Sequence, residues 1–224
     1  MRETVAATEA FELSFSAKTV RYYFDAAIES LADFVNLEDV IFITDDHLAA
    51  RIPFLDTQRS IVIPAGEQFK QQPTVDDIIS QLIEMEATRQ TLIIGVGGGV
   101  VTDITGYAAS IYMRGLRFGF VPTTILAQVD ASIGGKNGID AGVYKNLVGI
   151  IRQPDFILFD HKLLQTLPEL QWINGFAEII KHAAIADREM FDFLEQHTLD
   201  AFRKDHSLLA SLVKRNVLLK SGFV

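Results

Sequence analysis

Short apolar runs recur along the first two thirds of the chain, separated by polar segments. The run at 40–44 is continuously apolar, which is typical of a strand buried on both faces of a parallel sheet. Residues 11–16 alternate between apolar and polar side chains, which predicts a first strand with one polar face. The further predicted strands cover 60–64, 91–95, 118–121 and 156–160.

Between these strands, apolar residues recur at the three- and four-residue spacing of amphipathic helices. The spacing predicts helices at 20–34 and 76–87, and another helix that runs to Ala109. In the second of these helices the residues predicted to face inward are Ile78, Ile79, Leu82 and Ile83. Strands that alternate with helices indicate an α/β fold with a parallel, doubly wound, Rossmann-like sheet and right-handed crossovers.

From His161 onward the pattern contains only helices. One helix is expected to start at 166–169, and the others cover 172–186, 189–197 and 206–221. We therefore predict an α/β domain over residues 1–165 and the beginning of an all-helical domain over 166–224. Since no helix cap accompanies the last residues, this second domain is expected to be incomplete.

A glycine turn follows the strand at 91–95 and opens a helix, as Gly95-Val96-Gly97-Gly98-Gly99. Glycine lets the backbone approach an anion, and the first N–H groups of a helix point toward it. The turn therefore predicts a phosphate or nucleotide site, although a tight turn without a ligand fits the glycines equally well. Asp45, at the end of the strand at 40–44, is placed either to bind a ribose or to cap the next helix.

Residues 132–148 contain several glycines and polar side chains, and they predict a long loop. Long polar loops inside a compact domain are often functional. Basic residues gather in and around this loop and the glycine turn, namely Arg114, Lys136, Lys145 and Lys181. In so acidic a protein, this gathering suggests a site for an anionic substrate, with solvated surface lysines as the alternative.

The composition limits the partners. A formal net charge of −9 and a pI near 5.0 argue against binding to nucleic acid. Cysteine is absent, so a metal site would need His, Asp or Glu ligands. No apolar run approaches the length of a membrane span, so we expect a cytoplasmic protein without a membrane partner.

Glu178, Lys181 and His182 share one face of a predicted helix, because they are three and four residues apart. Together they could serve as metal ligand, phosphate contact and proton shuttle, or they could form an ordinary surface ion pair. His161, His197 and His206 lie near predicted helix ends, where a solvated or capping role is expected.

Six motifs, in order along the chain, carry a family resemblance. They are GGGVVTD at 97–103, YMRG at 112–115, VPTTILAQVD at 121–130, GGK at 134–136, KN at 145–146 and GFAEIIK at 175–181. Together they closely resemble 3-dehydroquinate synthase, a family of the sugar phosphate cyclase superfamily. The resemblance begins near Asp45 and continues to the last residue.

The resemblance implies a carbon–oxygen lyase of the shikimate pathway, which leads to the aromatic amino acids. The family converts 3-deoxy-D-arabino-heptulosonate 7-phosphate to 3-dehydroquinate and releases phosphate. It uses NAD catalytically and a divalent metal, usually zinc and possibly cobalt. The implied partners are a small phosphorylated sugar acid and a second copy of the chain in a homodimer.

The resemblance also assigns roles to individual residues. The implied NAD contacts are Asp45, Glu67, Lys70, Gly98, Gly99, Val100, Val101, Thr102, Asp103, Thr123, Thr124, Lys136, Lys145 and Thr166. The implied catalytic and substrate residues are Arg114, Asp130, Lys136, Lys145, Asn146 and Lys181, and the implied metal ligand is Glu178.

Three features depart from the family pattern. Asn137 and Asp140 alter the substrate loop, and His182 stands where the family often has tyrosine and is not assigned as a ligand. The family's two other metal ligands are histidines expected beyond Val224, so the chain alone is expected to be inactive. The alternatives are another cyclase of the deoxyinosose or valiolone type, a fold-sharing alcohol dehydrogenase, or a non-catalytic NAD-binding remnant.

Overall fold

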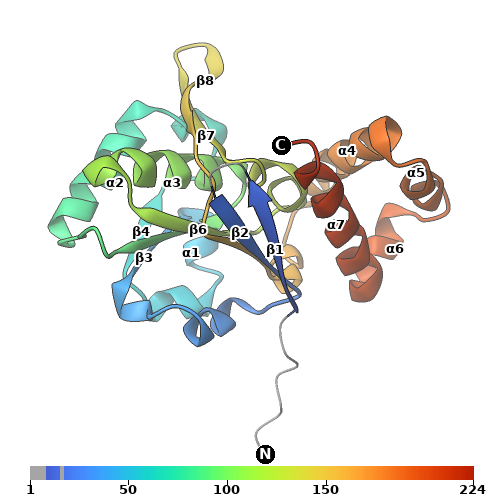
Figure 1. Cartoon of the computed structure of the whole chain (residues 1–224), viewed down its shortest axis with the longest axis horizontal. Helices are drawn as coiled ribbons and strands as arrows, with labels where there is room; N and C mark the ends of the chain where they lie inside the picture. The colour runs from blue at the N-terminus through green and yellow to red at the C-terminus, as the bar shows by residue number, and fades with distance from the viewer. Residues whose placement is uncertain (1–8, 16–17) are drawn as a thin grey trace, which may run out of the picture.

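A mixed β-sheet forms the centre of the molecule (Figure 1). The structure is a computed structural model, and it describes residues 9–15 and 18–224. The described residues form a seven-stranded sheet in the order β1-β2-β9-β6-β5-β3-β4. Its strands are β1 (Glu9–Phe15), β2 (Lys18–Phe24), β3 (Val40–Asp45), β4 (Ser60–Ile63), β5 (Leu92–Gly97), β6 (Arg117–Pro122) and β9 (Phe156–Phe159). All neighbours pair in parallel except β1 and β2, which are antiparallel.

The parallel strands bury both faces, as their apolar runs predict. In β3, Ile41 and Ile43 join one apolar core, whereas Val40 and Phe42 join a second core on the other face. Helices α2 (Gln72–Glu84) and α3 (Gly99–Ile111) contribute to the first core. The second core is closed by shorter segments, including η1 (Ile28–Asp33) and η3 (Pro53–Thr57). The doubly wound α/β prediction is therefore confirmed.

The predicted helix at 20–34 is wrong, because its first part is strand β2. Val20, Tyr22 and Phe24 are buried in alternation, which is the period of a strand. Only 28–33 are helical, as the short η1. The first strand is confirmed over 11–15, whereas Ser16 lies outside the described residues.

Helix α2 begins four residues earlier than predicted, and Pro73 occupies its first turn, where a missing N–H costs nothing. Ile78 and Leu82 are fully buried and Ile79 packs against the core, as expected. The inward prediction for Ile83 is wrong, because its side chain is 62% exposed.

The remainder of the chain after β9 is helical, as predicted. It comprises η7 (His161–Leu164), α4 (Glu169–Ala186), α5 (Arg188–Glu195), α6 (Leu199–Lys204) and α7 (His206–Ser221). Val213 and Val217 of α7 belong to the same apolar core as Tyr22 and Phe159 of the sheet. Among the described helices, none combines the length and apolar character needed to cross a membrane.

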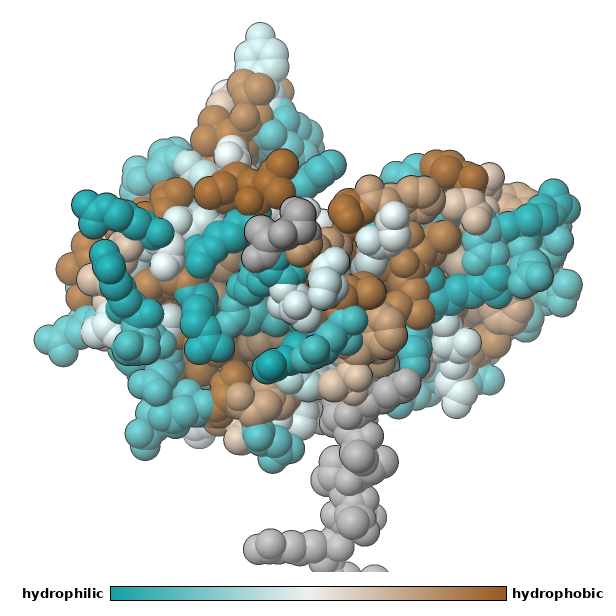
Figure 2. Space-filling view, viewed as in Figure 1, coloured by the Kyte–Doolittle hydropathy of each residue, from teal (hydrophilic) through white to brown (hydrophobic). Residues whose placement is uncertain are grey.

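The predicted loop at 132–148 is wrong, because most of it is a β-hairpin. Strands β7 (Lys136–Ala141) and β8 (Tyr144–Ile151) pair antiparallel as a separate sheet. The hairpin projects from the body of the molecule, and apolar residues gather on it (Figures 1 and 2). Leu147 and Ile151 of β8 are exposed although they are apolar, so this segment lacks the alternation of apolar and polar residues that predicts a strand.

Short helical segments complete the structure. They are η2 (Leu37–Asp39), α1 (Asp46–Ala49), η4 (Glu67–Phe69), η5 (Tyr112–Arg114) and the π-helical η6 (Ala127–Ala131). Both α1 and η6 directly follow parallel strands or their connecting turns, at the carboxyl edge of the sheet.

Asn137 anchors the hairpin against α3. Its buried amide donates to the carbonyl oxygens of Gly135 and Arg152. A Cβ on Gly106 of α3 would lie 1.8 Å from the Asn137 Oδ1 atom. The hairpin base therefore packs on α3 only because position 106 has no side chain.

Gly106→Ala should lower the free energy of unfolding by about 1–3 kcal/mol, the usual cost of overpacking a core. Alanine would otherwise favour a helix interior by about 1 kcal/mol. In an Asn137→Ala background, which removes the clashing oxygen, Gly106→Ala should become neutral or stabilising. Urea unfolding of the four proteins of this double-mutant cycle measures both effects.

Gly142→Ala is the matched control. Gly142 has a φ of 60° and no neighbouring atom within 4 Å of its built Cβ. Its substitution should cost about 1–2 kcal/mol from the left-handed backbone alone, equally in both backgrounds. Additive behaviour of Gly106→Ala and Asn137→Ala would contradict the proposed packing.

Candidate functional site

A cavity of about 780 Å³ opens at the carboxyl edge of the parallel strands. It is bordered by segments that follow β3, β4, β5, β6 and η7, which are distant in sequence. The predicted cofactor residues in its wall are Asp45, Glu67, Lys70, Gly98, Gly99, Val100, Val101, Asp103, Thr123, Thr124 and Thr166. Open α/β sheets bind ligands at this edge.

The glycine turn forms the floor of this cavity. A Cβ on Gly97 would lie 2.4 Å from the Val101 side chain, so the turn needs glycine there. Helix α3 starts at Gly99 without a side-chain cap, and its first intrahelical bond runs from Thr102 N to Gly98 O. The N–H groups of the first turn thus lie at the cavity without helical partners. Partial positive charge there suits a phosphate.

Lys70 connects the cavity to the hairpin. Its side chain is 6% exposed, and its ammonium lies 2.5 Å from Asp103 Oδ2 and 2.5 Å from Asn146 Oδ1. Burial raises the pKa of Asp103 to about 6, and the Lys70 charge opposes that rise. Because the Lys70 ammonium contacts both oxygens, it fixes the positions of the Asp103 and Asn146 side chains.

The hairpin delivers Asn146 to this contact. Asp140 N donates to Lys70 O, and Asp140 Oδ1 accepts from Asn146 N at 2.7 Å. The second bond holds Asn146 at a φ of 54°, which asparagine tolerates better than most residues. Asp140, a departure from the family pattern, therefore supports the hairpin geometry.

Lys145 and Lys136 occupy different parts of the hairpin. Lys145 Nζ lies 3.0 Å from Glu67 Oε1, and this bond raises the pKa of Lys145. Lys136 begins β7 and is exposed. The structure therefore brings Lys145 to the rim of the cavity, whereas it does not place Lys136 in the cavity wall.

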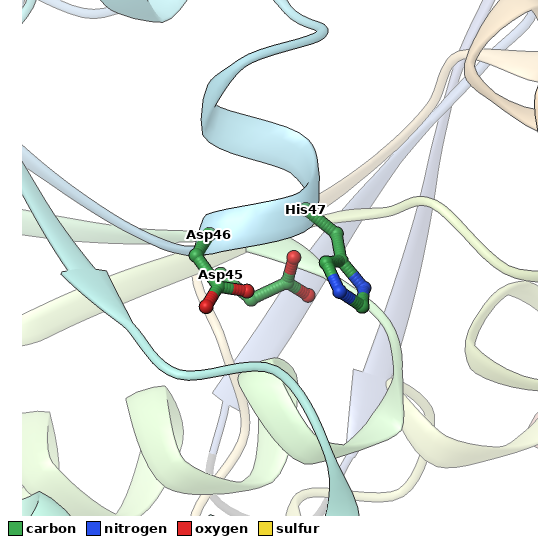
Figure 3. A group of neighbouring side chains, drawn as sticks. All are labelled: Asp45, Asp46 and His47. Carbon is green, nitrogen blue, oxygen red and sulfur yellow. The ribbon is translucent and has the colours of Figure 1, made fainter.

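Asp45 caps α1, the more ordinary of the two roles considered for it. Its Oδ1 accepts from Leu48 N at 3.0 Å, and burial raises the pKa of its carboxyl. Asp45, Asp46 and His47 lie together at the start of α1 (Figure 3). Asp46 accepts from Ala65 N, which ties α1 to the segment after β4. Asp45 also lines the cavity, so its ribose contact stays a prediction.

Two threonines of the predicted cofactor set form hydrogen bonds with the backbone. Thr124 Oγ1 accepts from Ala127 N and so starts the helical segment that contains η6. Thr102 Oγ1 donates to Gly99 O inside α3, and its side chain is buried behind the cavity wall. Thr102 is therefore placed to shape the turn rather than to touch a ligand.

A second group of polar residues joins η6 to α4. Asp130, Glu178 and His182 each present one ligand atom within 4.8 Å of the others. Lys220 Nζ lies 2.7 Å from Asp130 Oδ1, and Lys181 is paired with Glu178. This group brings together three predicted site residues, Asp130, Glu178 and Lys181. The sequence analysis missed Lys220 because its helix, α7, is distant in sequence.

One histidine and one arginine lie where the sequence did not indicate. His161 is buried, and its Nδ1–H donates to Gln128 Oε1, so the solvated role expected for it is wrong. Desolvation lowers the pKa of His161 to about 4. Arg114 is exposed beyond the carboxyl end of α3, opposite the glycine turn, and does not line the cavity.

Comparisons with known proteins agree on one family. Residues 60–174 match the family described as 3-dehydroquinate synthase N-terminal, and residues 175–224 match 3-dehydroquinate synthase C-terminal. The 3-dehydroquinate synthases of Thermodesulfovibrio yellowstonii and Dictyoglomus thermophilum are each 43% identical over 164 residues. Those matches cover 73% of this chain and 46% of each relative, so the chain spans about half the length of the relatives.

Solved structures of sugar phosphate cyclases share the fold. The 2-epi-5-epi-valiolone synthase of Streptomyces hygroscopicus, solved with NAD+ and Zn2+ bound, is 27% identical with a TM-score of 0.82. That match covers 92% of this chain and 61% of the other. A 2-deoxy-scyllo-inosose synthase, complexed with carbaglucose-6-phosphate, NAD+ and Co2+, is 27% identical with a TM-score of 0.69. This match covers 78% of this chain and 51% of the synthase chain.

Replacing Lys70 should raise the pKa of Asp103 above about 6, because the ammonium favours the charged carboxylate. Carbon-detected NMR titration of the Asp103 carboxyl in Lys70→Met and in the unaltered protein measures the shift. In the unaltered protein, lowering the pH through about 6 should neutralise Asp103 and weaken its pairing with Lys70.

Lys204→Met is the control for the loss of a lysine, since Lys204 pairs with Asp200 on the exposed α6. It should leave the Asp103 titration unchanged. An Asp103 titration near the ordinary value of about 3.9, or one that is insensitive to Lys70→Met, would refute the ion-pair assignment.

Proposed function

This chain belongs to the 3-dehydroquinate synthase family, and from that membership we propose that it carries the cofactor-binding part of such an enzyme. The proposed reaction is the conversion of 3-deoxy-D-arabino-heptulosonate 7-phosphate to 3-dehydroquinate with release of phosphate. Residues 1–165 would form the NAD-binding domain, and 166–224 would begin the helical domain that bears the metal ligand. A cytoplasmic homodimer is part of this proposal, and the exposed apolar β8 supports a protein interface.

One observation carries the proposal: the cavity at the sheet edge combines a helix N-terminus with the buried Lys70–Asp103 pair. The N–H groups of Gly99–Val101 would bind the NAD pyrophosphate, as expected at a helix start. Asp103, ionised above a pH of about 6, would accept a hydrogen bond from a ribose hydroxyl. NAD bound to the related 2-epi-5-epi-valiolone synthase supports this assignment.

The second group of residues fits a divalent cation. Ligand atoms of Asp130 and Glu178 lie within 4.8 Å of each other, and the ammonium groups of Lys220 and Lys181 now contact these carboxylates. Carboxylate oxygens are suitable ligands for zinc or cobalt, so Glu178 would hold the metal. When bound, such a metal acidifies a substrate hydroxyl for oxidation by NAD.

The chain's own residues would then bind and orient the substrate. Asn146 offers its amide at the end of the Lys70 contact, and Lys145 supplies a positive charge at the cavity rim. Lys181 lies beside Glu178 and could attract the substrate's anionic groups. In a protein with a net charge of −9, these local cations would be essential for capturing a phosphorylated acid.

Phosphate release from the heptulosonate phosphate, measured with NAD and zinc, tests the proposal. The chain is assayed alone and mixed with the separately expressed carboxyl-terminal half of the Thermodesulfovibrio yellowstonii relative. We expect phosphate release that depends on the added half. NAD binding without phosphate release in the mixture would instead indicate a non-catalytic NAD-binding protein.

Gly99→Asp should weaken NAD binding at least tenfold, measured by calorimetric titration. The new carboxylate would lie at the first turn of α3 and repel the pyrophosphate. Gly142→Asp adds the same charge at the hairpin turn, which does not line the cavity, and should leave NAD affinity unchanged. Equal losses in the two variants would contradict the assigned phosphate position.

A further inference from the structure

Three polar side chains meet where the sheet joins the helical end of the chain. Asp25 directly follows β2, and His161 starts η7 two residues after β9. The two strands are parallel neighbours with Phe24 opposite Phe159, so the segments after them leave the sheet side by side. His206 begins α7, and its ring centre lies 5.7 Å from that of His161. These three residues, distant in sequence, are brought together only by the fold.

The hydrogen bonds of His161 fix its tautomer. Gln128 Nε2 donates to Pro122 O at 3.1 Å, and because this carbonyl can only accept, the amide oxygen of Gln128 must face His161. His161 Nδ1 lies 3.1 Å from that oxygen and therefore carries a proton. Burial lowers the pKa of His161 to about 4, so the ring is neutral at neutral pH. Its Nε2 then has a free lone pair, as in histidines that bind metals.

This lone pair is buried without a partner. His161 is 4% exposed, and its Nε2 has no hydrogen-bond partner among the described residues. A buried polar atom in a native protein normally contacts a protein group, a water or an ion. The ionisable groups that act electrostatically on the His161 ring are Asp25 and His206. The atom that lacks a donor or a cation thus lies near a carboxylate and a second imidazole.

Asp25 and His206 can supply further ligands. His206 Nε2 lies 3.1 Å from Asp25 Oδ1, close to the roughly 3.4 Å between two ligand atoms on a tetrahedral zinc ion. Zinc–nitrogen bonds of about 2.0–2.1 Å place two bound imidazole rings roughly 5 Å apart, near the observed 5.7 Å. The side chains of His206 and Asp25 are 51% and 61% exposed, so both can turn toward the buried Nε2 of His161. Binding an ion therefore requires movement of surface side chains only.

We propose that His161 Nε2, His206 and Asp25 bind a divalent transition-metal ion of the zinc class at the junction of β2, η7 and α7. This site uses none of the residues of the metal site proposed around Glu178 and does not depend on it. Imidazole nitrogens and a carboxylate oxygen suit zinc, cobalt and nickel. Gln128 holds the His161 ring by its Nδ1–H, as outer-shell acceptors orient metal-bound histidines. A bound ion fastens the start of α7 to the sheet.

Calorimetric zinc titration of the Glu178→Gln chain tests the proposal, because that substitution removes the ligand of the other proposed metal site. We expect one zinc ion per chain. Loss of an outer-shell contact already weakens metal binding about 10- to 100-fold, so His206→Ala and His161→Leu should each weaken it about 100-fold or more. His47→Ala is the control, since it removes a histidine from the other group of close ligand atoms, and it should leave the affinity unchanged.

Nitrogen-15 NMR of the histidine rings identifies the ligands directly. Zinc should shift the Nε2 resonance of His161 and a ring-nitrogen resonance of His206, whereas His161 Nδ1 should stay protonated because it is bonded to Gln128. The ring resonances of His47 should stay in place. Circular dichroism melts show which variants are folded, and the exposed position of His206 makes His206→Ala informative even where the buried His161→Leu unfolds.

Absence of zinc binding in the Glu178→Gln chain would overturn the inference, and so would zinc affinity that is lost in His47→Ala but kept in His206→Ala. A bound zinc ion that leaves the His161 resonances in place would overturn it as well. The proposed function fails separately, when NAD binding or phosphate release with the added half of the relative is absent.

Discussion

The buried ammonium of Lys70 is the interaction on which the site depends. An isolated buried charge is costly, and removing its partners typically destabilises a protein by about 3–5 kcal/mol. Lys70 is stabilised by Asp103, which lies on α3 in the cavity wall, and by Asn146 of the hairpin. Because both partners must stay within hydrogen-bond distance, the sheet edge and the hairpin are fixed relative to each other. The Lys70–Asp103 pair and the Asn146 amide, which would contact a substrate, are therefore positioned together.

The rest of the site follows from the parallel sheet. Strands β3, β5 and β6 end at the same edge, and each is followed there by a turn or helix that presents polar groups. Helix α4 then packs on η6, so that Glu178 comes to lie beside Asp130. An acidic protein thereby obtains local positive potential from a helix terminus and a few lysines, without changing its net charge.

The strands that bury both faces could be predicted from the sequence, because a continuous apolar run is typical of such a strand. Strand β3 is predicted on that basis, whereas the helix after the glycine turn and the helical end of the chain are predicted from apolar residues at helical spacing. Residues 20–34 predict a helix because Tyr23 and the apolar residues after β2 (Ala26, Ala27, Leu31 and Phe34) fit helical spacing, although the first part of this range is strand β2. The sequence predicts a loop where the hairpin lies, because β8 exposes its side chains and the hairpin is held by tertiary contacts such as the bond from Asp140 N of β7 to Lys70 O.

The candidate site was predictable where residues cluster in sequence, as in the glycine turn and Glu178. It was not predictable where tertiary packing creates the contact. Nothing in the sequence shows that Asn216 meets His182 across two helices, or that Asp130 faces Glu178. The resemblance supplied roles for Asp130 and Glu178, yet it gave none to His182, Asn216 or Lys220.

A crystal structure of this chain with NAD bound tests the central claim most directly. The account predicts the pyrophosphate within hydrogen-bond distance of the N–H groups of Gly99–Val101, with a ribose hydroxyl on Asp103. The nicotinamide ring should then point toward Glu178. NAD bound elsewhere, or bound in this cavity with its pyrophosphate away from the start of α3, would contradict the account.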